Sequence, residues 1–244
     1  MSTDIPTFFL ESDAWHTPWQ LDAVEAHHFS TVLRGKAGAR IRLLDGTGRE
    51  GIFRVLALAK RSVSLEPINF FTHPKPERET ILAVAWTKAA RRGWLMEKAV
   101  ELGLSALWIW QGDHSQMQLP GKISMSWRQQ LIAGAKQCNN PWLPELSLIP
   151  SGSAGLIAKA QSVERAFVLW EDESDTFLQP EDLALPGRTL FIIGPEGGLS
   201  GAEIDAFQAV NMRTVTVGRR ILRYETAALL CLGLSWWGRE RVNA

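Results

Sequence analysis

Two loops near the C-terminal end of the chain carry the residue types best suited to chemistry. The first, residues 194–198, reads Gly-Pro-Glu-Gly-Gly and follows the apolar run 190–193. The second, residues 218–226, reads Gly-Arg-Arg-Ile-Leu-Arg-Tyr-Glu-Thr and follows the run 214–217. Ligands of open parallel sheets bind in the crevice outside the carboxyl ends of the strands. We therefore predict that the two loops form two walls of one pocket, a glycine-rich wall for a small molecule and an arginine-bearing wall for an anionic substrate.

The glycine-rich loop has residues that let a ligand approach the backbone closely. Pro195 fixes its φ angle and removes an N–H donor just after the strand. Gly197 and Gly198 have no Cβ to keep a ligand away, so the loop can offer backbone groups to the edge of an adenine. Ser200 and Glu203 have the spacing of a capping box, which predicts a helix after the loop. The alternative is a tight strand-to-helix turn, which glycine and proline also favour.

The second loop places a cation where a helix disfavours one. Arg223 stands just before a predicted helix whose N-cap we assign to Thr226. A cation opposes the helix dipole there, whereas arginine stays charged and binds oxyanions with planar geometry. Arg223 is therefore a candidate catalytic residue. Glu225 is a second candidate, but a carboxylate suits the dipole at this position, so a structural role explains it at least as well.

The chain divides into two parts that differ in the order of their expected strands and helices. Residues 71–79 contain two prolines and several charged residues, and we expect them to form a linker, with the domain boundary between residues 73 and 74. The part before it, 1–73, has short β-like runs and one helix-like segment, which is typical of a small β-barrel. Its expected strands are 8–10, 40–44, 51–58 and 62–65, and its expected helix is 25–33.

The part after the linker, 74–244, alternates strands and helices. Alternation of this kind implies an α/β fold, a parallel sheet with helices on both faces. The expected strands are 80–86, 107–110, 146–149, 166–170, 189–193 and 213–217. The expected helices are 91–102, 126–137, 153–161, 201–210 and 226–239.

A further glycine pattern, residues 46–51, matches the dinucleotide-binding sequence G-x-G-x-x-G. That fingerprint needs a helix directly after it, so that the helix N-terminus meets the pyrophosphate. The residues that follow, 52–56, are apolar and β-branched, and Asp45-Gly46 is a strong hairpin signal. We therefore predict a β-hairpin here rather than a nucleotide site.

Composition narrows the class of protein. The chain has 244 residues, of which 45% are hydrophobic and 21% charged, and this is typical of a soluble globular protein. It has no apolar run long enough to span a membrane, and its N-terminus lacks the pattern of a signal peptide. Only Cys138 and Cys231 are present, which fits a reducing cytoplasm, and no Cys and His spacing suits a metal site.

Basic residues are concentrated in the N-terminal part, although the net charge of the chain is zero. Between residues 34 and 61 they outnumber acidic residues several-fold. A basic stripe of this kind can neutralise RNA phosphates. The alternative, which composition alone favours, is that these are the solvated faces of ordinary strands. The basic residues of the stripe are Arg34, Lys36, Arg40, Arg42, Arg49, Arg54, Lys60 and Arg61.

The two loops together resemble the signature of the RsmE-type ribosomal RNA uridine-N3 methyltransferases, which belong to the SPOUT superfamily. The resemblance rests on residues 193–198 and 218–227, and it extends over nearly the whole chain. Residues 28–34, His-Phe-Ser-Thr-Val-Leu-Arg, resemble a segment of the family's N-terminal PUA-like RNA-binding domain. Residues 98–103, Lys-Ala-Val-Glu-Leu-Gly, resemble the end of a family helix.

The resemblance implies a fold, a cofactor and partners. The fold is a knotted SPOUT-type parallel sheet with a C-terminal trefoil knot, preceded by a PUA-like domain. The cofactor is S-adenosylmethionine, and the reaction is methylation of N3 of a uridine in 16S rRNA of the small ribosomal subunit. The partners are that rRNA or subunit and a second copy of the chain in a homodimer. Trp236 and Trp237 adjoin on the last helix, so one of them is expected to face the partner copy.

The resemblance also assigns residues to the cofactor, and both loops would contact it. The cofactor-binding residues that it implies are Leu169, Ile193, Gly194, Pro195, Glu196, Gly197, Gly198, Gly218, Ile221, Leu222, Arg223, Thr226 and Ala227. The RNA-binding residues that we expect are Arg34, Lys36, Arg40, Arg42, Arg91 and Arg92.

Three segments depart from the family pattern. Residues 88–92 read Lys-Ala-Ala-Arg-Arg in place of Arg-Gly-x-(Lys/Arg)-Met, and residues 112–114 read Gly-Asp-His in place of Ser-Glu-Arg. In the segment 136–140, Lys136 stands where the family has an acid and Asn140 where it has an arginine. The residues that the resemblance assigns to the cofactor keep the family pattern. The three altered segments are expected on the side that faces the RNA, so the identity of the target nucleotide stays open.

The chemistry that we expect is an in-line methyl transfer. Uridine N3 attacks the sulfonium methyl as its proton leaves, and negative charge spreads onto O2 and O4. A guanidinium aimed there would stabilise that charge, which is the role expected for Arg223, with Arg91 or Arg92 as helpers. Glu225 beside an arginine is a poor proton acceptor, so water is the alternative base. Two other functions stay open: a knotted methyltransferase acting on another RNA position, such as a ribose hydroxyl, and a catalytically inactive RNA-binding protein.

Overall fold

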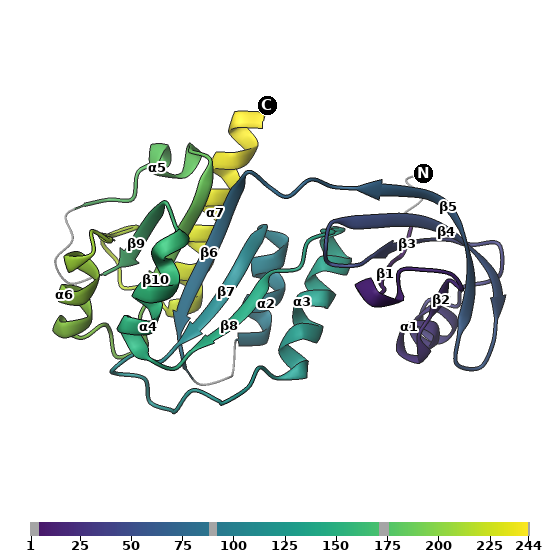
Figure 1. Ribbon diagram of the computed structural model, residues 1–244, viewed down its shortest axis with the longest axis horizontal. Coiled ribbons are helices and arrows are strands. Elements are labelled where there is room, and N and C mark those ends of the chain that lie inside the picture. Colours follow the sequence, from purple (N-terminus) through teal and green to yellow (C-terminus); the bar gives the residue numbers. More distant parts are fainter. Residues whose placement is uncertain (1–4, 88–91, 171–175, 244) are drawn as a thin grey trace. The chain divides into compact units, whose positions relative to one another are not determined.

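The chain folds into two compact units, which are described here one at a time. The computed structural model describes residues 5–87, 92–170 and 176–243 (Figure 1). The first unit ends at Lys75 but also includes Ile132–Leu143, and the second contains Pro76–Leu131 and the chain from Pro144 onward. The segment Ile132–Leu143 lies far beyond the boundary expected between residues 73 and 74, so the first unit is discontinuous in sequence.

The first unit is built on a five-stranded sheet with the order β1-β3-β4-β5-β2. The strands are β1 (Thr7–Phe9), β2 (Gln20–Leu21), β3 (Arg40–Leu44), β4 (Arg49–Leu58) and β5 (Val63–Thr72). β1 runs parallel to β3, and the other neighbouring pairs are antiparallel. Alternate residues of the long strands face one buried core, because successive side chains of a strand point to opposite faces. That core includes Phe8, Leu21, Phe29, Ile41, Leu43, Phe53, Val55 and Val63.

A hairpin connects β3 and β4 at the glycine pattern 46–51, as predicted. The buried carboxylate of Asp45 accepts hydrogen bonds from the backbone N–H groups of Thr47 (2.8 Å) and Arg49 (3.0 Å). Burial by itself would raise the pKa of Asp45, but these bonds and the guanidinium of Arg49 hold it below its usual value. The glycines of this pattern therefore shape a turn, and β4 follows where a nucleotide site would need a helix.

The helical segment of this unit differs from the expected single helix over 25–33. Asp22 caps α1 (Ala23–His27), and the chain continues as one π-helical turn over His28–Val32. The turn ends at Val32, and two residues later Arg34 has a left-handed φ of 52°. A Cβ at Gly35 would lie 2.2 Å from the Phe29 ring, so the next residue must be glycine for this ring to stay buried.

Residues 132–143 join the first unit through apolar packing. Ile132 and Leu143 pack with Phe9 and Leu44. The segment is the C-terminal part of α3 (Met125–Cys138) and the loop after it. Gly48 donates a backbone hydrogen bond to the carbonyl of Pro141 at 2.9 Å. These contacts join parts of the chain that are distant in sequence, so no local pattern indicates them.

The second unit contains a six-stranded sheet with the order β11-β9-β10-β6-β7-β8, in which all neighbouring strands are parallel. A parallel sheet with the predicted βα alternation is therefore confirmed. Its strands are β6 (Arg78–Ala85), β7 (Leu104–Trp110), β8 (Glu145–Ile149), β9 (Arg165–Leu169), β10 (Gly187–Ile193) and β11 (Arg213–Val215). The linker is shorter than predicted, because β5 continues to Thr72 and β6 begins at Arg78.

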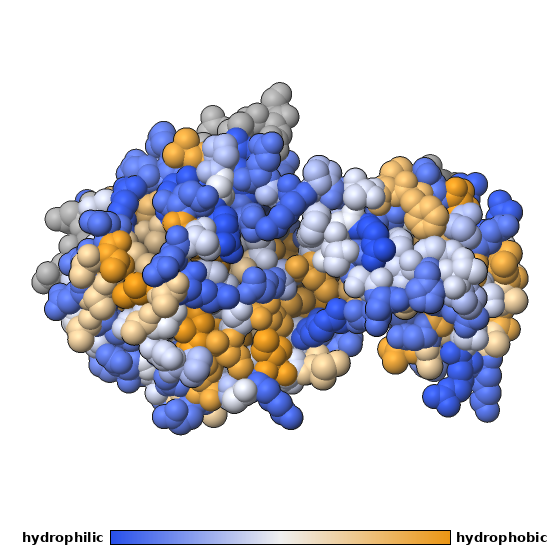
Figure 2. Space-filling model, in the orientation of Figure 1, coloured by the Kyte–Doolittle hydropathy of each residue, from blue (hydrophilic) through white to orange (hydrophobic). Residues whose placement is uncertain are grey.

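Helices cover both faces of this sheet, as predicted (Figure 1). On one face α2 (Arg92–Glu101) packs against α7 (Tyr224–Asn243), and α7 packs on β6 and β10. On the other face α4 (Gly152–Lys159) packs against α6 (Gly201–Ala209). β6 alternates between the two layers, since Ile81, Ala83 and Ala85 join Phe207 of α6 in one core cluster. In Figure 2 one area of apolar surface lies around α4 and β8.

A half-buried arginine attaches the C-terminal part of α7 to the rest of the unit. Arg239 donates hydrogen bonds to the carbonyls of Leu102 (2.7 Å) and Gly103 (3.3 Å), where α2 ends, and to the hydroxyl of Thr80 (3.1 Å). Gly103 has a left-handed φ of 72°, which fits the predicted helix stop. These bonds satisfy carbonyl groups that the end of a helix leaves without an intrahelical donor.

Two expectations about helices need correction. α7 begins at Tyr224, so Thr226 lies inside its first turn and is not the N-cap, and the Thr226 N–H already bonds to the Arg223 carbonyl at 2.9 Å. A short helix, α5 (Pro180–Ala184), was not predicted; a capping box between Gln179 and Asp182 begins it. No helix in the described ranges is both long and apolar enough to cross a membrane. The trefoil knot implied by the family resemblance stays a prediction.

Candidate active site

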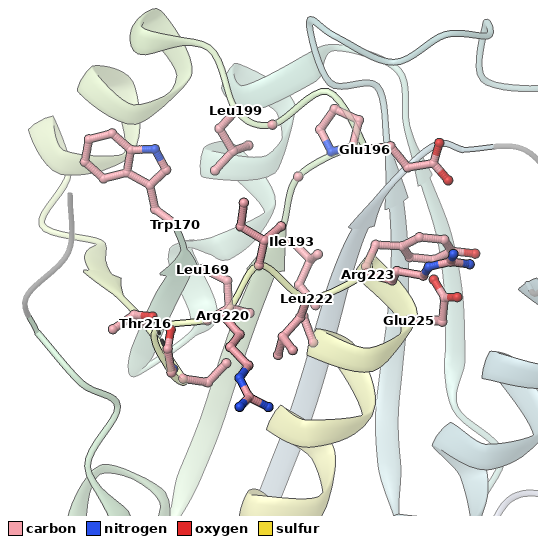
Figure 3. A pocket seen from close by; sticks show the side chains of 18 of the residues that line it. Leu169, Trp170, Ile193, Glu196, Leu199, Thr216, Arg220, Leu222, Arg223 and Glu225 are labelled. Carbon is pink, nitrogen blue, oxygen red and sulfur yellow. Dashed lines mark hydrogen bonds between the residues drawn. The ribbon is translucent and has the colours of Figure 1, made fainter. Parts of the chain in front are cut away.

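Both loops singled out in the sequence line one cavity of about 600 Å³ in the second unit (Figure 3). The glycine-rich loop leaves the end of β10, and the arginine-bearing loop leaves the end of β11. β9 lies between these two strands, and its end supplies Leu169 and Trp170. The cavity therefore lies at the carboxyl edge of the parallel sheet, where such sheets bind ligands.

The lining contains most of the residues that the sequence assigned to a cofactor. These are Leu169, Ile193, Gly194, Pro195, Glu196, Gly198, Gly218, Ile221, Leu222, Arg223 and Ala227. Glu225 lines the cavity as well. Gly197 and Thr226 do not belong to the lining. Sequence reasoning missed Trp170, Leu199, Val215, Thr216, Val217, Arg220 and Tyr224. Their positions directly beside the predicted residues, at strand ends and in the same loops, were the available signal.

The glycine-rich loop is a tight turn that leads into a capped helix. The Gly198 N–H bonds to the Pro195 carbonyl at 2.9 Å, and Gly198 has a φ of 77°, which favours glycine. The predicted capping box is present: Ser200 Oγ accepts from the Glu203 N–H (3.1 Å) and Glu203 Oε2 accepts from the Ser200 N–H (2.8 Å). The loop is thus closed by a backbone hydrogen bond within its turn and ends in a helix start that side-chain hydrogen bonds satisfy.

Gly197 points away from the cavity. A Cβ built on it would lie 3.1 Å from the Cβ of His114, in the segment that follows β7. The His114 imidazole lies against the carbonyls of Gly197 and Gly198. One side of the glycine-rich loop therefore faces the cavity, and the other side packs on the segment around His114.

The arginine-bearing loop is more open. Thr216 Oγ1 donates to the Gly218 carbonyl (2.7 Å), and beyond this turn Arg219, Arg220 and Arg223 are exposed. Ile221 is 81% exposed. Arg220 and Arg223 point to different sides of Leu222 (Figure 3). The lining thus presents two guanidinium groups at separate places, together with apolar side chains.

Arg223 and Glu225, the two candidate catalytic residues, lie close together at the start of α7 (Figure 3). Arg223 is exposed, whereas Glu225 is only 4% exposed. Arg223 precedes the first helical residue, Tyr224, so a cation does stand at a helix N-terminus, as predicted. A solvent-facing guanidinium and a buried carboxylate suit different roles: the first can meet an incoming anion, and the second can interact with a group inside the cavity.

The predicted helper Arg92 is engaged by aromatic rings. Its guanidinium lies 3.6 Å from the Trp86 ring centroid and 5.4 Å from that of Trp127, and it donates to the Thr87 carbonyl. Burial lowers the pKa of Arg92, although arginine remains charged at any working pH. The hydroxyl of Tyr224 is buried, without a hydrogen-bond partner in the described ranges. Arg91, the other predicted helper, lies outside the described residues.

The predicted RNA-binding residues of the first unit fall into two groups. Arg34, Lys36 and Arg40 are exposed. Arg42 is half-buried and forms an ion pair with Glu50, with 2.9 Å between Nε and Oε1. Arg42 is therefore already paired with a carboxylate, whereas the other three present their charges to solvent.

The altered segment 136–140 makes contacts inside the first unit. Lys136 Nζ donates to both carboxylate oxygens of Glu25 at 2.7 Å. The Asn140 side-chain carbonyl accepts from the Trp142 N–H at 3.0 Å. In the altered segment 88–92, only Arg92 lies within the described residues. These departures from the family pattern thus have structural partners where the structure describes them.

Comparison with known proteins places the chain in a family. Residues 73–236 match the model of the RNA methyltransferase domain, and residues 21–68 match that of the RNA methyltransferase PUA domain. Ribosomal RNA small subunit methyltransferase E of Mesomycoplasma hyopneumoniae is 29% identical over 161 residues, which cover 65% of this chain and 69% of that protein.

Solved structures share the fold over nearly the full length. A probable rRNA-methyltransferase from Porphyromonas gingivalis has a TM-score of 0.84 and 25% identity, covering 98% of this chain and 100% of that one. Ribosomal RNA small subunit methyltransferase E from Neisseria gonorrhoeae, bound to S-adenosyl methionine, has a TM-score of 0.80 and 22% identity, covering 93% and 95%. With the family model matching well over half of its residues, the chain belongs to the RNA methyltransferase family.

Proposed function

We propose that this protein transfers a methyl group from S-adenosylmethionine to N3 of a uridine in the 16S rRNA of the small ribosomal subunit. The observation that carries the proposal is the single cavity in which the glycine-rich loop, the apolar ends of β9 and β10, and Arg223 meet. Relatives named ribosomal RNA small subunit methyltransferase E support the class of substrate.

The residues of the cavity fit this cofactor. Its volume of about 600 Å³ is within the usual range for small-molecule sites. Leu169, Ile193 and Leu222 offer apolar surface for an adenine, and the glycine-rich loop offers backbone groups for its polar edge. A Cβ at Gly198 or Gly218 would meet no atom within 4 Å, so the backbone there borders open space.

The charged lining suits the rest of the cofactor. Glu196 can balance an ammonium, and Arg220 can pair with a carboxylate. When bound, the cofactor would supply an electrophilic methyl group on sulfur. Arg223, just before α7, is exposed, so a nucleobase can reach it.

Arg223 stabilises the charge that develops on the base. Methyl transfer to N3 requires loss of the N3 proton, and the resulting charge spreads over O2 and O4. A guanidinium that already lies at the cavity rim can stabilise the charge on one of these oxygens, and no solvent has to reorganise as the charge develops. Glu225, buried at the start of α7, is the protein group nearest to Arg223 in sequence that can accept the proton, and water is the alternative. Most of the rate then comes from positioning N3 in line with the methyl group.

The first unit holds the RNA through phosphates. Arg34, Lys36 and Arg40 are exposed, so they can neutralise phosphate groups. Arg42 would have to leave Glu50 to do the same. RNA affinity should therefore fall steeply as salt rises, and binding that is insensitive to salt would contradict this part of the proposal.

The active protein is a homodimer that pairs through α7. Leu230, Leu234 and Trp237 follow one another at helical spacing and are 37%, 38% and 57% exposed. An apolar stripe of this kind is typical of an interface. Sedimentation should give the mass of a dimer, and Trp237→Glu should give a monomer. A wild-type monomer at micromolar concentration would contradict the proposed pairing.

The test is methylation of small subunits that lack the modification, followed by mapping of the methylated nucleotide. The proposal predicts one methyl group on N3 of a single uridine. A methyl group on a ribose hydroxyl or on another base would leave an RNA methyltransferase with a different target. Binding of RNA without any methyl transfer would instead support a catalytically inactive RNA-binding protein.

A further inference from the structure

The glycine-rich loop has a second set of partners on the side away from the cavity. They belong to the residues that follow β7, which are distant from the loop in sequence. Trp110 Nε1 donates to the Ile193 carbonyl at 3.3 Å, where the loop begins. A Cβ at Gly112 would lie 3.2 Å from the ring of Pro195, so the backbone at Gly112 packs closely on this ring. The segment 110–114 therefore backs the loop along its length.

Asp113 extends the capping box of α6 into this segment. Its N–H donates to Glu203 Oε1 at 2.9 Å, and its carboxylate accepts from the Ser200 hydroxyl at 2.5 Å. Glu203 is only 1% exposed, and its other oxygen accepts from the Ser200 N–H. Glu203 thus joins the segment after β7 to the start of α6 through two backbone donors. A buried carboxylate is costly without hydrogen-bond donors, so the folded protein favours keeping both N–H groups in contact with Glu203.

His114 holds the tip of the loop. Its Nδ1 lies 3.1 Å from the Gly197 carbonyl oxygen and 3.2 Å from that of Gly198. Both oxygens can only accept, so Nδ1 must carry the proton. Gly197 allows this approach because a side chain there would collide with the Cβ of His114. The contact fixes the carbonyl side of a turn whose other side lines the cavity.

We propose that His114, supported by Asp113, is a positioning residue for the cofactor: it holds the glycine-rich loop in its binding conformation and so sets the affinity for S-adenosylmethionine. The inference rests on the proposed function for the identity of the ligand. The physical reason is preorganisation, because a loop that is already ordered loses less conformational freedom when the ligand binds. His114 itself does not line the cavity and makes no contact with the reacting atoms.

Binding calorimetry with S-adenosylmethionine on the full chain tests this role. His114→Ala should weaken binding about 5- to 10-fold, which corresponds to one lost hydrogen bond. His114→Asn should restore most of the affinity, because its amide nitrogen occupies nearly the place of Nδ1, whereas His114→Gln should not. His16→Ala is the matched control, since His16 Nδ1 bonds to a backbone carbonyl (Thr17, 2.9 Å) in the first unit and should leave affinity unchanged.

Kinetics separate positioning from catalysis. His114→Ala should raise the KM for the cofactor by a similar factor and leave kcat at saturating cofactor and RNA close to the wild-type value. Affinity in His114→Ala within twofold of wild type would overturn the proposal. Equal losses in the Ala and Asn variants would overturn it as well, since the donated hydrogen bond would then not matter.

Hydrogen exchange of the ligand-free protein keeps the inference separate from the proposed function. In His114→Ala the amides of Gly198 and Leu199 should exchange several times faster than in wild type, while those of β6 are unchanged. If wild type does not bind S-adenosylmethionine, the proposed function fails, and faster exchange would still support the role of His114 in ordering the loop. Unchanged exchange in the variant would sink that role whatever the ligand.

Discussion

The glycine-rich wall of the cavity is held by a hydrogen bond within its own turn and by hydrogen bonds involving two neighbouring segments, whereas the arginine-bearing wall is largely exposed. On the first wall, the loop is fixed by its own turn, by the capping box of Ser200 and Glu203, and by the segment around His114. On the second, Thr216 and Gly218 form one turn, and three arginines and Ile221 beyond it face solvent.

The contrast indicates a division of labour between the walls. A loop whose backbone is ordered before binding suits a small ligand that recurs in every turnover. Exposed arginines suit a large anionic partner, because they can adjust to phosphates and oxyanions on arrival. The ordered wall would therefore act mainly on cofactor affinity, and Arg223 of the open wall would act mainly on catalysis, so substitutions at these two places should have separable effects.

The largest effect is expected from the open wall. Arg223→Ala should lower kcat about 10²- to 10³-fold, because it removes a preorganised charge from the developing oxyanion. Cofactor affinity should change by no more than a few-fold. Single-turnover methylation and calorimetry on the same variant measure the two quantities. Wild-type turnover in Arg223→Ala would remove this residue from the mechanism, and a large loss of cofactor affinity would break the division between the walls.

The second-largest effect is expected on stability, from the contacts that hold the C-terminal part of α7. This helix follows directly after the open wall. Arg239→Ala removes hydrogen bonds to the carbonyls of Leu102 and Gly103 and to Thr80. It should lower the free energy of unfolding of the second unit by about 2 kcal/mol, since bonds to charged donors are among the stronger ones. Urea denaturation measures this loss. Arg219→Ala, on the exposed loop, is the control and should change it by less than about 0.5 kcal/mol.

Hydrogen exchange in Arg239→Ala tests whether the two walls are held independently. Arg239→Ala should speed exchange in α2 and α7 but leave the glycine-rich loop protected, because that loop is held from β7 and α6. Faster exchange in both loops would show that the two walls are not held independently, and it would contradict the comparison.

The smallest effect is expected from the ordered wall. Gly198→Ala adds a methyl group where no atom lies within 4 Å, but at a φ of 77°. The strain of that backbone conformation costs about 1 kcal/mol for a residue with a Cβ, so the free loop should relax away from its binding conformation. Cofactor binding, which has to restore that conformation, should then weaken about 5-fold. The kcat at saturating cofactor should stay near wild type. Calorimetry measures the affinity and initial rates measure kcat. A larger effect on kcat than on affinity would contradict the account, because it would give the glycine-rich wall a part in catalysis.

Local patterns predicted much of this site. The apolar runs that end in glycine-rich or arginine-rich loops gave the strands β10 and β11, and a parallel sheet brings such ends to one edge. The capping box of Ser200 and Glu203 was visible because it depends on residues three apart. The start of α7 was misplaced, because Thr226 has the side chain of an N-cap while the backbone already turns at Tyr224.

Tertiary contacts account for what the sequence could not show. His114 and Gly197 meet only because β7 and β10 lie in one sheet, and their spacing in the chain carries no signal. Residues 132–143 join the first unit because Ile132 and Leu143 fill a cluster with Phe9 and Leu44. The family resemblance assigned Leu169 at the end of β9, but nothing in the local sequence marks its neighbour Trp170 as a lining residue.

The most direct test of the account is hydrogen exchange of the full chain with and without S-adenosylmethionine. The account predicts that amides in both loops, residues 194–199 and 218–227, slow together when the cofactor is added, with the larger change in the loop that is more open beforehand. No change in either loop, or slowing confined to another part of the protein, would contradict a cofactor site between the two walls.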